Sequence, residues 1–279
     1  MSDGLGYRWE IENHAQLAAT SSPLSLAYGA YAAPPTICHR PWRRKRVKFQ
    51  GSMGSCTGAS RASGGEVLNY IASGGGLLTL STMYCYLQNQ IESGLIGHDQ
   101  GATIDGSVRA AMRTGFALEE TFPYPNPVRY STEIPPPATA EGKLHLVAKH
   151  MVMRSYDDCF TWLSSGVGDI LIGVPWLQGM TQVGPTMELS DLSGHMLGGH
   201  AMLIHGYGGE AAEPMVDRDG RPYLDLENSH GAQWGEGGFC LISPRVIDYW
   251  IQNRATLIGI SDMTTYGPRQ IATYQEWLG

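Results

Sequence analysis

Residues 49–60, FQGSMGSCTGAS, place Cys56 in a run of glycine and serine, six positions after Gln50. The residues that follow, 56–73, are compatible with a helix, and Gly74 would end it. A cysteine in the first turn of a helix lies near unpaired N–H groups and the positive end of the dipole, which favour a thiolate. The alternative is a buried structural thiol, because free cysteines are among the most buried residue types.

A cysteine nucleophile needs a base, a group that orients the base, and donors for the oxyanion. His200 begins the apolar run GGHAMLIHGYG of residues 198–208, so a strand would hold its ring. Asn228, in NSHGAQWGEGGF, can orient an imidazole without competing for its proton. The side-chain amide of Gln50 and the backbone N–H of Cys56 could form an oxyanion hole. These residue types predict acyl transfer through a thiol.

The order of helical and strand-like segments predicts an α+β fold. Residues 50–125 contain the expected helices, and residues 140–260 contain short apolar runs that predict antiparallel strands. A proline-rich crossing separates these two halves, so a cleft between them is expected. The expected helices cover 56–73, 82–93 and 103–114, and the expected strands cover 169–176, 200–208, 221–229 and 238–243, with a hairpin turn at Asp219 and Gly220.

Composition limits the class of protein. The chain has 279 residues, 42% of them hydrophobic, which is enough for one large domain over residues 34–279 after an arm over residues 1–33. The formal charge of −7 argues against nucleic acid as the main partner. No apolar run reaches the roughly 18 residues that span a bilayer, and the N-terminus lacks a signal core. We therefore expect a cytoplasmic protein, or one carried in a particle or assembly, that binds no membrane.

The remaining cysteines and histidines do not indicate a metal or cofactor. The other four cysteines are spread without a CxxC pair, so we expect core thiols and a reducing compartment. His195, His200 and His205 are spaced by fives, which on a loop and strand does not bring three rings together. We also expect the basic run of residues 39–48 to be a solvated surface segment. These four cysteines are Cys38, Cys85, Cys159 and Cys240.

Three motifs resemble those of the papain-like cysteine peptidases: VKFQGSMGSC, GGHAMLIHGYG and NSHGAQWGEGGF, in the order cysteine, histidine, asparagine. The separation of 144 residues (200 − 56) between Cys56 and His200 falls within this family's range. The resemblance implies a helical left half and a β-barrel-like right half. It also implies a Cys56–His200–Asn228 site with Gln50 at the oxyanion. Residues that would bind the substrate backbone are Gly101, Ala102 and Gly199.

Three residues depart from this family's pattern. Thr57 replaces the aromatic residue after the nucleophile, Met53 replaces an upstream cysteine, and His230 replaces a tryptophan that shields the bond between asparagine and histidine. We therefore expect a wetter, weaker orienting bond. The departures leave open a structural or binding subunit of a larger assembly, such as a virion or secretion-type complex, on the same scaffold.

Two other classes of thiol enzyme are alternatives to a papain-like peptidase. A cell-wall amidase or a transglutaminase-like enzyme would share the cysteine and histidine, but the motif after Asn228 favours the papain-like family. The expected partner is a protein or peptide substrate.

We expect the arm to lie away from the cleft or against another subunit, through which a homo-oligomer or larger assembly could form. At about 33 residues the arm is short for a helical inhibitory propeptide.

Overall fold

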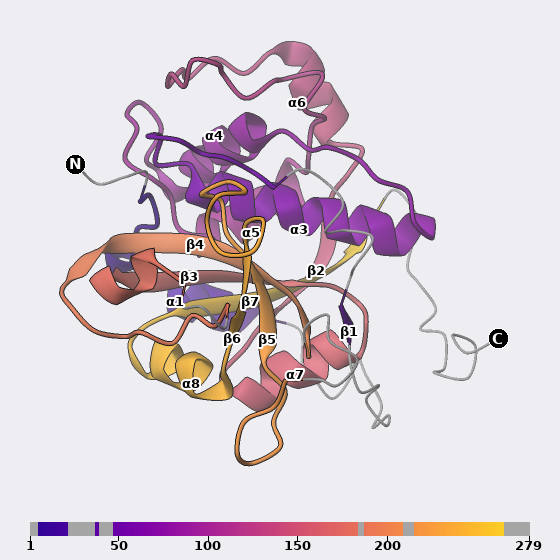
Figure 1. The fold of residues 1–279 in the computed structure, drawn as a ribbon. Helices are drawn as coiled ribbons and strands as arrows, with labels where there is room; N and C mark the ends of the chain where they lie inside the picture. Colours follow the sequence, from indigo (N-terminus) through magenta and orange to yellow (C-terminus); the bar gives the residue numbers. More distant parts are fainter. Residues whose placement is uncertain (1–4, 22–36, 39–46, 184–186, 209–214, 265–279) are drawn as a thin grey trace.

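The computed structural model describes residues 5–21, 37–38, 47–183, 187–208 and 215–264 (Figure 1). The helices are η1 (Trp9–Ile11), α1 (His14–Thr20), α3 (Cys56–Ser73), α4 (Thr82–Ser93), α5 (Ile104–Arg113), α6 (Pro136–Gly142), α7 (Tyr156–Ser164), η3 (Gln178–Thr181) and α8 (Pro244–Gln252). The strands are β1 (Ile37–Cys38), β2 (Val147–Val152), β3 (Ile170–Leu177), β4 (Met196–Tyr207), β5 (Leu224–Glu227), β6 (Phe239–Ile242) and β7 (Thr256–Met263). Within these ranges no helix has the length and apolar character needed to cross a membrane.

The strands form one antiparallel sheet in the order β2-β7-β3-β4-β5-β6, and β1 pairs with β4. Helices α3, α4 and α5 precede strands β2 to β7 in the chain, and Figure 1 shows α3 and α4 above the sheet, so the α+β prediction is confirmed. The Asp219–Gly220 turn is also confirmed, because Asp217 N donates to Arg221 O and Val216 pairs with Pro222.

The two faces of the sheet build two cores. Ile170 and Ile172 of β3 pack with Trp162 of α7 and Trp250 of α8, whereas Leu171 between them packs with the side chains of α3. This alternation follows from the period of two along a strand. Figure 1 shows α3 on one side of the sheet and α7 and α8 on the other. The long central strands therefore hold α3, which begins at Cys56, directly against β4, which contains His200.

Helix ends follow the sequence signals. Gly74 ends α3 with a φ of 70°, and Gly94 ends α4 with the same φ, the left-handed conformation that glycine adopts without a steric penalty. Ser81 caps α4, because its side chain accepts a hydrogen bond from Tyr84 N. The sequence analysis did not predict α1. This helix has only 7 residues, too few for a clear period, and Asn13 caps it by accepting from Gln16 N.

Candidate active site

Cys56 occupies the first position of α3, as the sequence predicted, and its side chain is fully buried. Burial raises the pKa of the thiol to about 11, although the backbone N–H groups of Ala201, Gly6 and Thr57 act in the opposite direction. The expected low thiol pKa is therefore wrong for this conformation. Desolvation outweighs the backbone donors, because burial disfavours the charged form.

His200 and Asn228 are brought together from two neighbouring strands. His200 lies in β4, Asn228 follows β5, and the His200 Nε2 atom is 2.7 Å from the Asn228 Oδ1 atom. The other ring nitrogen, His200 Nδ1, is buried and has no hydrogen-bond partner among the described residues. The N–H of Ala201, the next residue along β4, lies against the Cys56 thiol. The fold thus places the imidazole between Asn228 on one side and a buried Nδ1 atom on the other.

The imidazole of His200 is shielded by two rings. The Trp176 ring centroid lies 4.8 Å from that of His200, and the His230 centroid lies 4.7 Å away at an interplanar angle of 30°. His200 and Asn228 are only 0% and 1% exposed, so the expected wetter bond is wrong for this conformation. Burial, followed by the charge of His230, lowers the pKa of His200 to about 3, against the opposing bond from Asn228.

Gln50 lies beside the same loop as Asn228. Its Oε1 atom accepts from the Ser229 hydroxyl at 2.5 Å, and its Nε2 atom donates to the Met53 carbonyl at 2.9 Å. Its backbone N–H donates to Ser229 O at 3.0 Å. These bonds fix the amide between the loop that precedes Cys56 and the loop that follows Asn228. The role of the Gln50 side-chain amide as a donor to the oxyanion stays a prediction.

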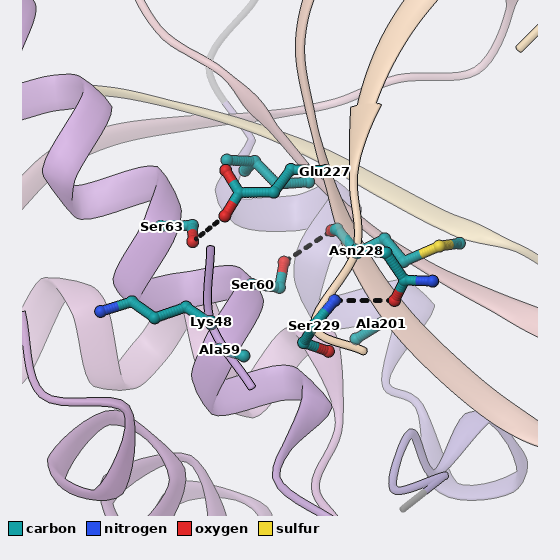
Figure 2. A pocket seen from close by; sticks show the side chains of 10 residues that line it. Lys48, Ala59, Ser60, Ser63, Ala201, Glu227, Asn228 and Ser229 are labelled. Carbon is teal, nitrogen blue, oxygen red and sulfur yellow. Dashed lines mark hydrogen bonds between the residues drawn. The ribbon is translucent and has the colours of Figure 1, made fainter. Parts of the chain in front are cut away.

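Hydrogen bonds between α3 and the sheet set the positions of the three site residues. Ser60 donates to Met202 O at 2.6 Å, and Ser63 donates to Glu227 Oε1 at 2.8 Å. Met202 lies two residues after His200, and Glu227 directly precedes Asn228. A small pocket opens beside these bonds, and Figure 2 shows Ser60 and Ser63 on α3 facing Glu227 and Asn228. The helix that begins at Cys56 is thereby bonded to both strands that carry or precede His200 and Asn228.

Two further sequence predictions concern the basic run of residues 39–48 and the cysteines other than Cys56. Lys48 is only 9% exposed and pairs with Glu66 at 2.7 Å, so a solvated position is wrong for this residue. The rest of the basic run, 39–46, lies outside the described residues. The prediction of core thiols is confirmed for Cys85, Cys159 and Cys240, which are buried. The side chain of Cys38 lies outside the described set.

Residues 5–12, here called the strap, run through the site. Tyr7 N donates to Gly199 O at 3.0 Å, Arg8 N donates to Ala102 O at 2.9 Å, and Ala102 N donates to Gly6 O at 2.8 Å. The strap therefore pairs with the backbone on both sides of Cys56. The expectation that the arm lies away from the cleft is wrong for these residues. Backbone groups make the pairing, and they leave no side-chain pattern in the sequence.

Close contacts between glycines allow the strap to lie this deep. A Cβ atom on Gly6 would overlap the carbonyl oxygen of Gly54, two residues before Cys56. A Cβ atom on Gly101 would overlap the carbonyl oxygen of Gly6. Gly101, Ala102 and Gly199, which the sequence analysis placed along a peptide substrate, all contact the strap. The strap therefore occupies the positions expected for a peptide.

The end of the strap is fixed to α5. The Glu12 carboxylate accepts hydrogen bonds from Ile104 N at 2.8 Å and from Asp105 N at 2.6 Å, at the first turn of the helix. Such N–H groups have no partner within the helix and bind carboxylates well. Burial nevertheless raises the pKa of Glu12 to about 7, while the backbone bond from Ile104, the bond with the Tyr7 side chain and the charge of Arg109 act to lower it. No sequence signal identified Glu12.

Known proteins share the family and the fold of this chain. A family model described as papain family cysteine protease matches residues 39–258. Similar solved structures include xylellain, a cysteine protease from Xylella fastidiosa (19% identity, TM-score 0.69, 93% of this chain and 96% of that chain). Others are digestive procathepsin L 3 of the Tenebrio molitor larval midgut (17%, 0.66, 87% and 74%) and procathepsin B S9 from Trypanosoma congolense (16%, 0.66, 93% and 87%). No curated protein sequence matches the chain. At these identities the solved structures show a shared fold.

Proposed function

The chain belongs to the papain family of cysteine proteases, and from this premise we propose that Cys56, His200 and Asn228 hydrolyse peptide bonds once the strap has left the cleft. The observation that carries the proposal is the 2.7 Å contact between His200 Nε2 and Asn228 Oδ1. It leaves Nδ1 as the ring atom that can exchange a proton with the thiol. Asn228 can orient this ring without taking its proton.

Each residue has one role in the proposed reaction. His200 takes the thiol proton, and the Cys56 thiolate attacks the substrate carbonyl carbon. The backbone N–H of Cys56 and the Gln50 amide stabilise the oxyanion. The imidazolium then protonates the leaving amine, and the thioester that remains is hydrolysed by water, from which His200 takes a proton. Free enzyme and two peptide products result.

The strapped conformation is a latent state in this proposal. With burial raising the pKa of Cys56 to about 11 and lowering that of His200 to about 3, both groups are neutral near pH 7. A neutral thiol is a weak nucleophile. The strap also takes the backbone partners, Ala102 and Gly199, that a peptide would use. Departure of the strap would let water and substrate reach both groups.

The test compares variants in the full-length chain with Gly6→Ala, a change that should displace the strap. We expect this chain to hydrolyse an unfolded protein such as reduced casein, and Cys56→Ala to abolish the activity. Asn228→Ala should slow hydrolysis by about 5- to 150-fold, the equivalent of a lost bond to a buried group of about 1–3 kcal/mol. It should slow alkylation of Cys56 by iodoacetamide less, because alkylation needs no protonated leaving group. Equal hydrolysis by Cys56→Ala would reject the proposal.

A further inference from the structure

We propose that the phenol of Tyr124 positions both donors of the oxyanion hole, the Gln50 amide and the Cys56 N–H, so that its loss slows hydrolysis without weakening substrate binding. Tyr124 lies in the proline-rich crossing between the two halves, within the run PYPNP of residues 123–127. The inference rests on the proposed hydrolysis and adds a positioning residue to it.

Residues 50–55, here called the oxyanion loop, join the two donors. Gln50 begins the loop, and the backbone N–H of Cys56 directly follows it. The loop is a tight turn, because Met53 N donates to Gln50 O at 3.3 Å and the Gln50 amide donates to Met53 O at 2.9 Å. Gln50 and Ser55, its two end residues, are both 0% exposed. A shift of either end therefore moves one donor relative to the other.

The Tyr124 hydroxyl contacts both ends of this loop. Its oxygen lies 2.8 Å from Gln50 O and 2.6 Å from Ser55 Oγ. A phenol has one proton and a carbonyl oxygen can only accept, so Tyr124 donates to Gln50 and accepts from Ser55. Burial, the largest cause, raises the pKa of Tyr124 to about 12, and the bond from Ser55 acts in the opposite direction. The phenol therefore keeps its proton near neutral pH, and both bonds persist.

The bond to Tyr124 also accounts for the way α3 begins. Ser55 is the N-cap residue of α3, a position where a serine side chain ordinarily accepts from a backbone N–H of the first turn. The Ser55 side chain makes no such bond. Its hydroxyl donates to Tyr124 instead, while its carbonyl accepts from Ala59 N at 3.0 Å. The peptide group that carries the Cys56 N–H is thus held from outside the helix.

Tyr124 is itself fixed to the helical half. Its backbone N–H donates to Glu119 Oε1 at 2.7 Å. Its half-buried ring packs in a cluster that contains Met83 and Leu87 of α4 and Met53 of the oxyanion loop. The side chain is therefore held at its backbone, along its ring and at its hydroxyl, and it sets the oxyanion loop at a fixed place relative to α4.

A second bond to the loop contacts neither donor residue. The Asp99 carboxylate accepts from Gly54 N at 3.0 Å and 3.2 Å, and from the Tyr86 hydroxyl at 2.6 Å. Asp99 is exposed, so water competes for this bond. The bond remains when Tyr124 is changed. We therefore expect Tyr124→Phe to shift the donors rather than release the loop.

Tyr124→Phe is the first test, because it removes one oxygen atom and keeps the ring. Ser55 then loses its acceptor and can turn toward the free N–H groups of α3, which moves the Cys56 N–H. In the full-length Gly6→Ala chain we expect kcat for a fluorogenic peptide to fall about 10- to 100-fold, with KM changed less than about twofold. Alkylation of Cys56 by iodoacetamide forms no oxyanion and should keep its rate. An unchanged kcat would overturn the inference.

Tyr130→Phe is the matched control. Tyr130 is half-buried in the same crossing, but its hydroxyl donates to Gln90 Oε1 of α4 at 2.7 Å. The control removes the same atom from the same residue type and should leave kcat unchanged. A fall as large as that in Tyr124→Phe would overturn the inference, because general loosening of the crossing would then be the cause.

Ser55→Ala tests the partner of the phenol. It should also slow turnover, and adding it to Tyr124→Phe should cause little further loss, because both changes remove the same bond. Losses that multiply in the double variant would contradict a shared bond. If Tyr124→Phe fails to fold, Ser55→Ala alone decides through the same comparison of kcat, KM and alkylation.

Binding of a peptide aldehyde separates this inference from the proposed function. The Cys56 sulfur adds to the aldehyde carbon of acetyl-leucyl-leucyl-norleucinal, the π pair moves to the oxygen, and this oxygen takes the thiol proton through His200. The oxygen of the resulting thiohemiacetal lies at the oxyanion donors. Half-protection of Cys56 from iodoacetamide is measured by mass spectrometry for this aldehyde and for its alcohol, which forms no bond. We expect Tyr124→Phe to weaken binding of the aldehyde about 10- to 100-fold and that of the alcohol less than about twofold.

The outcomes distinguish the two proposals. Weaker aldehyde binding together with slower hydrolysis supports both. Weaker aldehyde binding in a chain that hydrolyses no peptide supports the positioning role and rejects the peptidase. Hydrolysis and aldehyde binding that are both unchanged in Tyr124→Phe overturn the inference and leave the peptidase. Equal weakening of the aldehyde and the alcohol would also overturn it, because Tyr124 would then act on peptide binding.

Discussion

The amide nitrogen of Tyr7 lies 3.0 Å from the carbonyl oxygen of Gly199, the residue before His200. On the opposite wall, Arg8 donates to Ala102. The strap therefore uses the backbone groups of both walls and covers the thiol between them. We propose that this short segment governs access to the site.

Gly6→Ala should activate the full-length chain. The added Cβ atom would overlap the backbone oxygen of Gly54, which cannot move aside as a side chain could. Each loss of about 1.4 kcal/mol in the free energy of strap docking raises the population of the open state tenfold. We therefore expect the rate of hydrolysis of a fluorogenic peptide to rise by about tenfold or more. His14→Ala, on the exposed face of α1 outside the cleft, is the matched control. Activity equal to that of the wild type would show that the strap does not limit access.

Glu12 should make docking of the strap depend on pH. Burial raises its pKa from an ordinary 4.5 to about 7 in the docked state, so docking takes up a proton. Docking is then strongest below about pH 4.5, weakens as the pH rises to about 7, and is constant above that. Hydrogen exchange of the Tyr7 and Arg8 amides, corrected for intrinsic rates, should show this loss of protection. In Glu12→Gln the protection should be independent of pH over the same window, and an unchanged profile would contradict the role of Glu12.

His230→Trp should raise the pKa of His200. Burial is the larger cause of the low pKa and would remain, but the charge of His230 at a ring distance of 4.7 Å would be removed. The imidazolium should then persist to higher pH in the Gly6→Ala chain, and turnover should rise. NMR titration of the His200 ring measures the shift. His195→Trp, at an exposed histidine, should have no effect, and a lower pKa in His230→Trp would refute the argument.

The sequence singles out three candidate catalytic residues, because each has a local signature. Cys56 lies in a glycine-rich run at a helix start, His200 opens an apolar strand, and Asn228 follows another. The structure brings the last two within 2.7 Å of each other, as the expected orienting contact requires, and their catalytic roles stay predictions. The ends of the helices have local signals as well, because α3 and α4 end at Gly74 and Gly94, where the sequence predicts their ends.

The strap and its consequences could not be predicted from the sequence. Gly6 and Tyr7 hold the strap in place through backbone hydrogen bonds and through the packing of the Tyr7 ring against Gly173. Neither kind of contact leaves a periodic pattern in the sequence. The prediction of a low pKa for the Cys56 thiol was wrong for the same reason. The helix start favours a thiolate, but the strap excludes water from Cys56, and desolvation is the larger effect. Only the three-dimensional arrangement shows which effect prevails.

The most direct test of latency is the pH profile of Cys56 alkylation in the full-length chain and in Gly6→Ala. The wild-type thiol should react slowly near pH 7 and faster only toward its pKa of about 11. In Gly6→Ala the exposed thiol, paired with His200, should react rapidly from mildly acidic pH, and His200→Ala in that chain should abolish this reactivity. Two identical profiles, or a Gly6→Ala thiol that reacts only above about pH 8 like a free cysteine, would contradict the account.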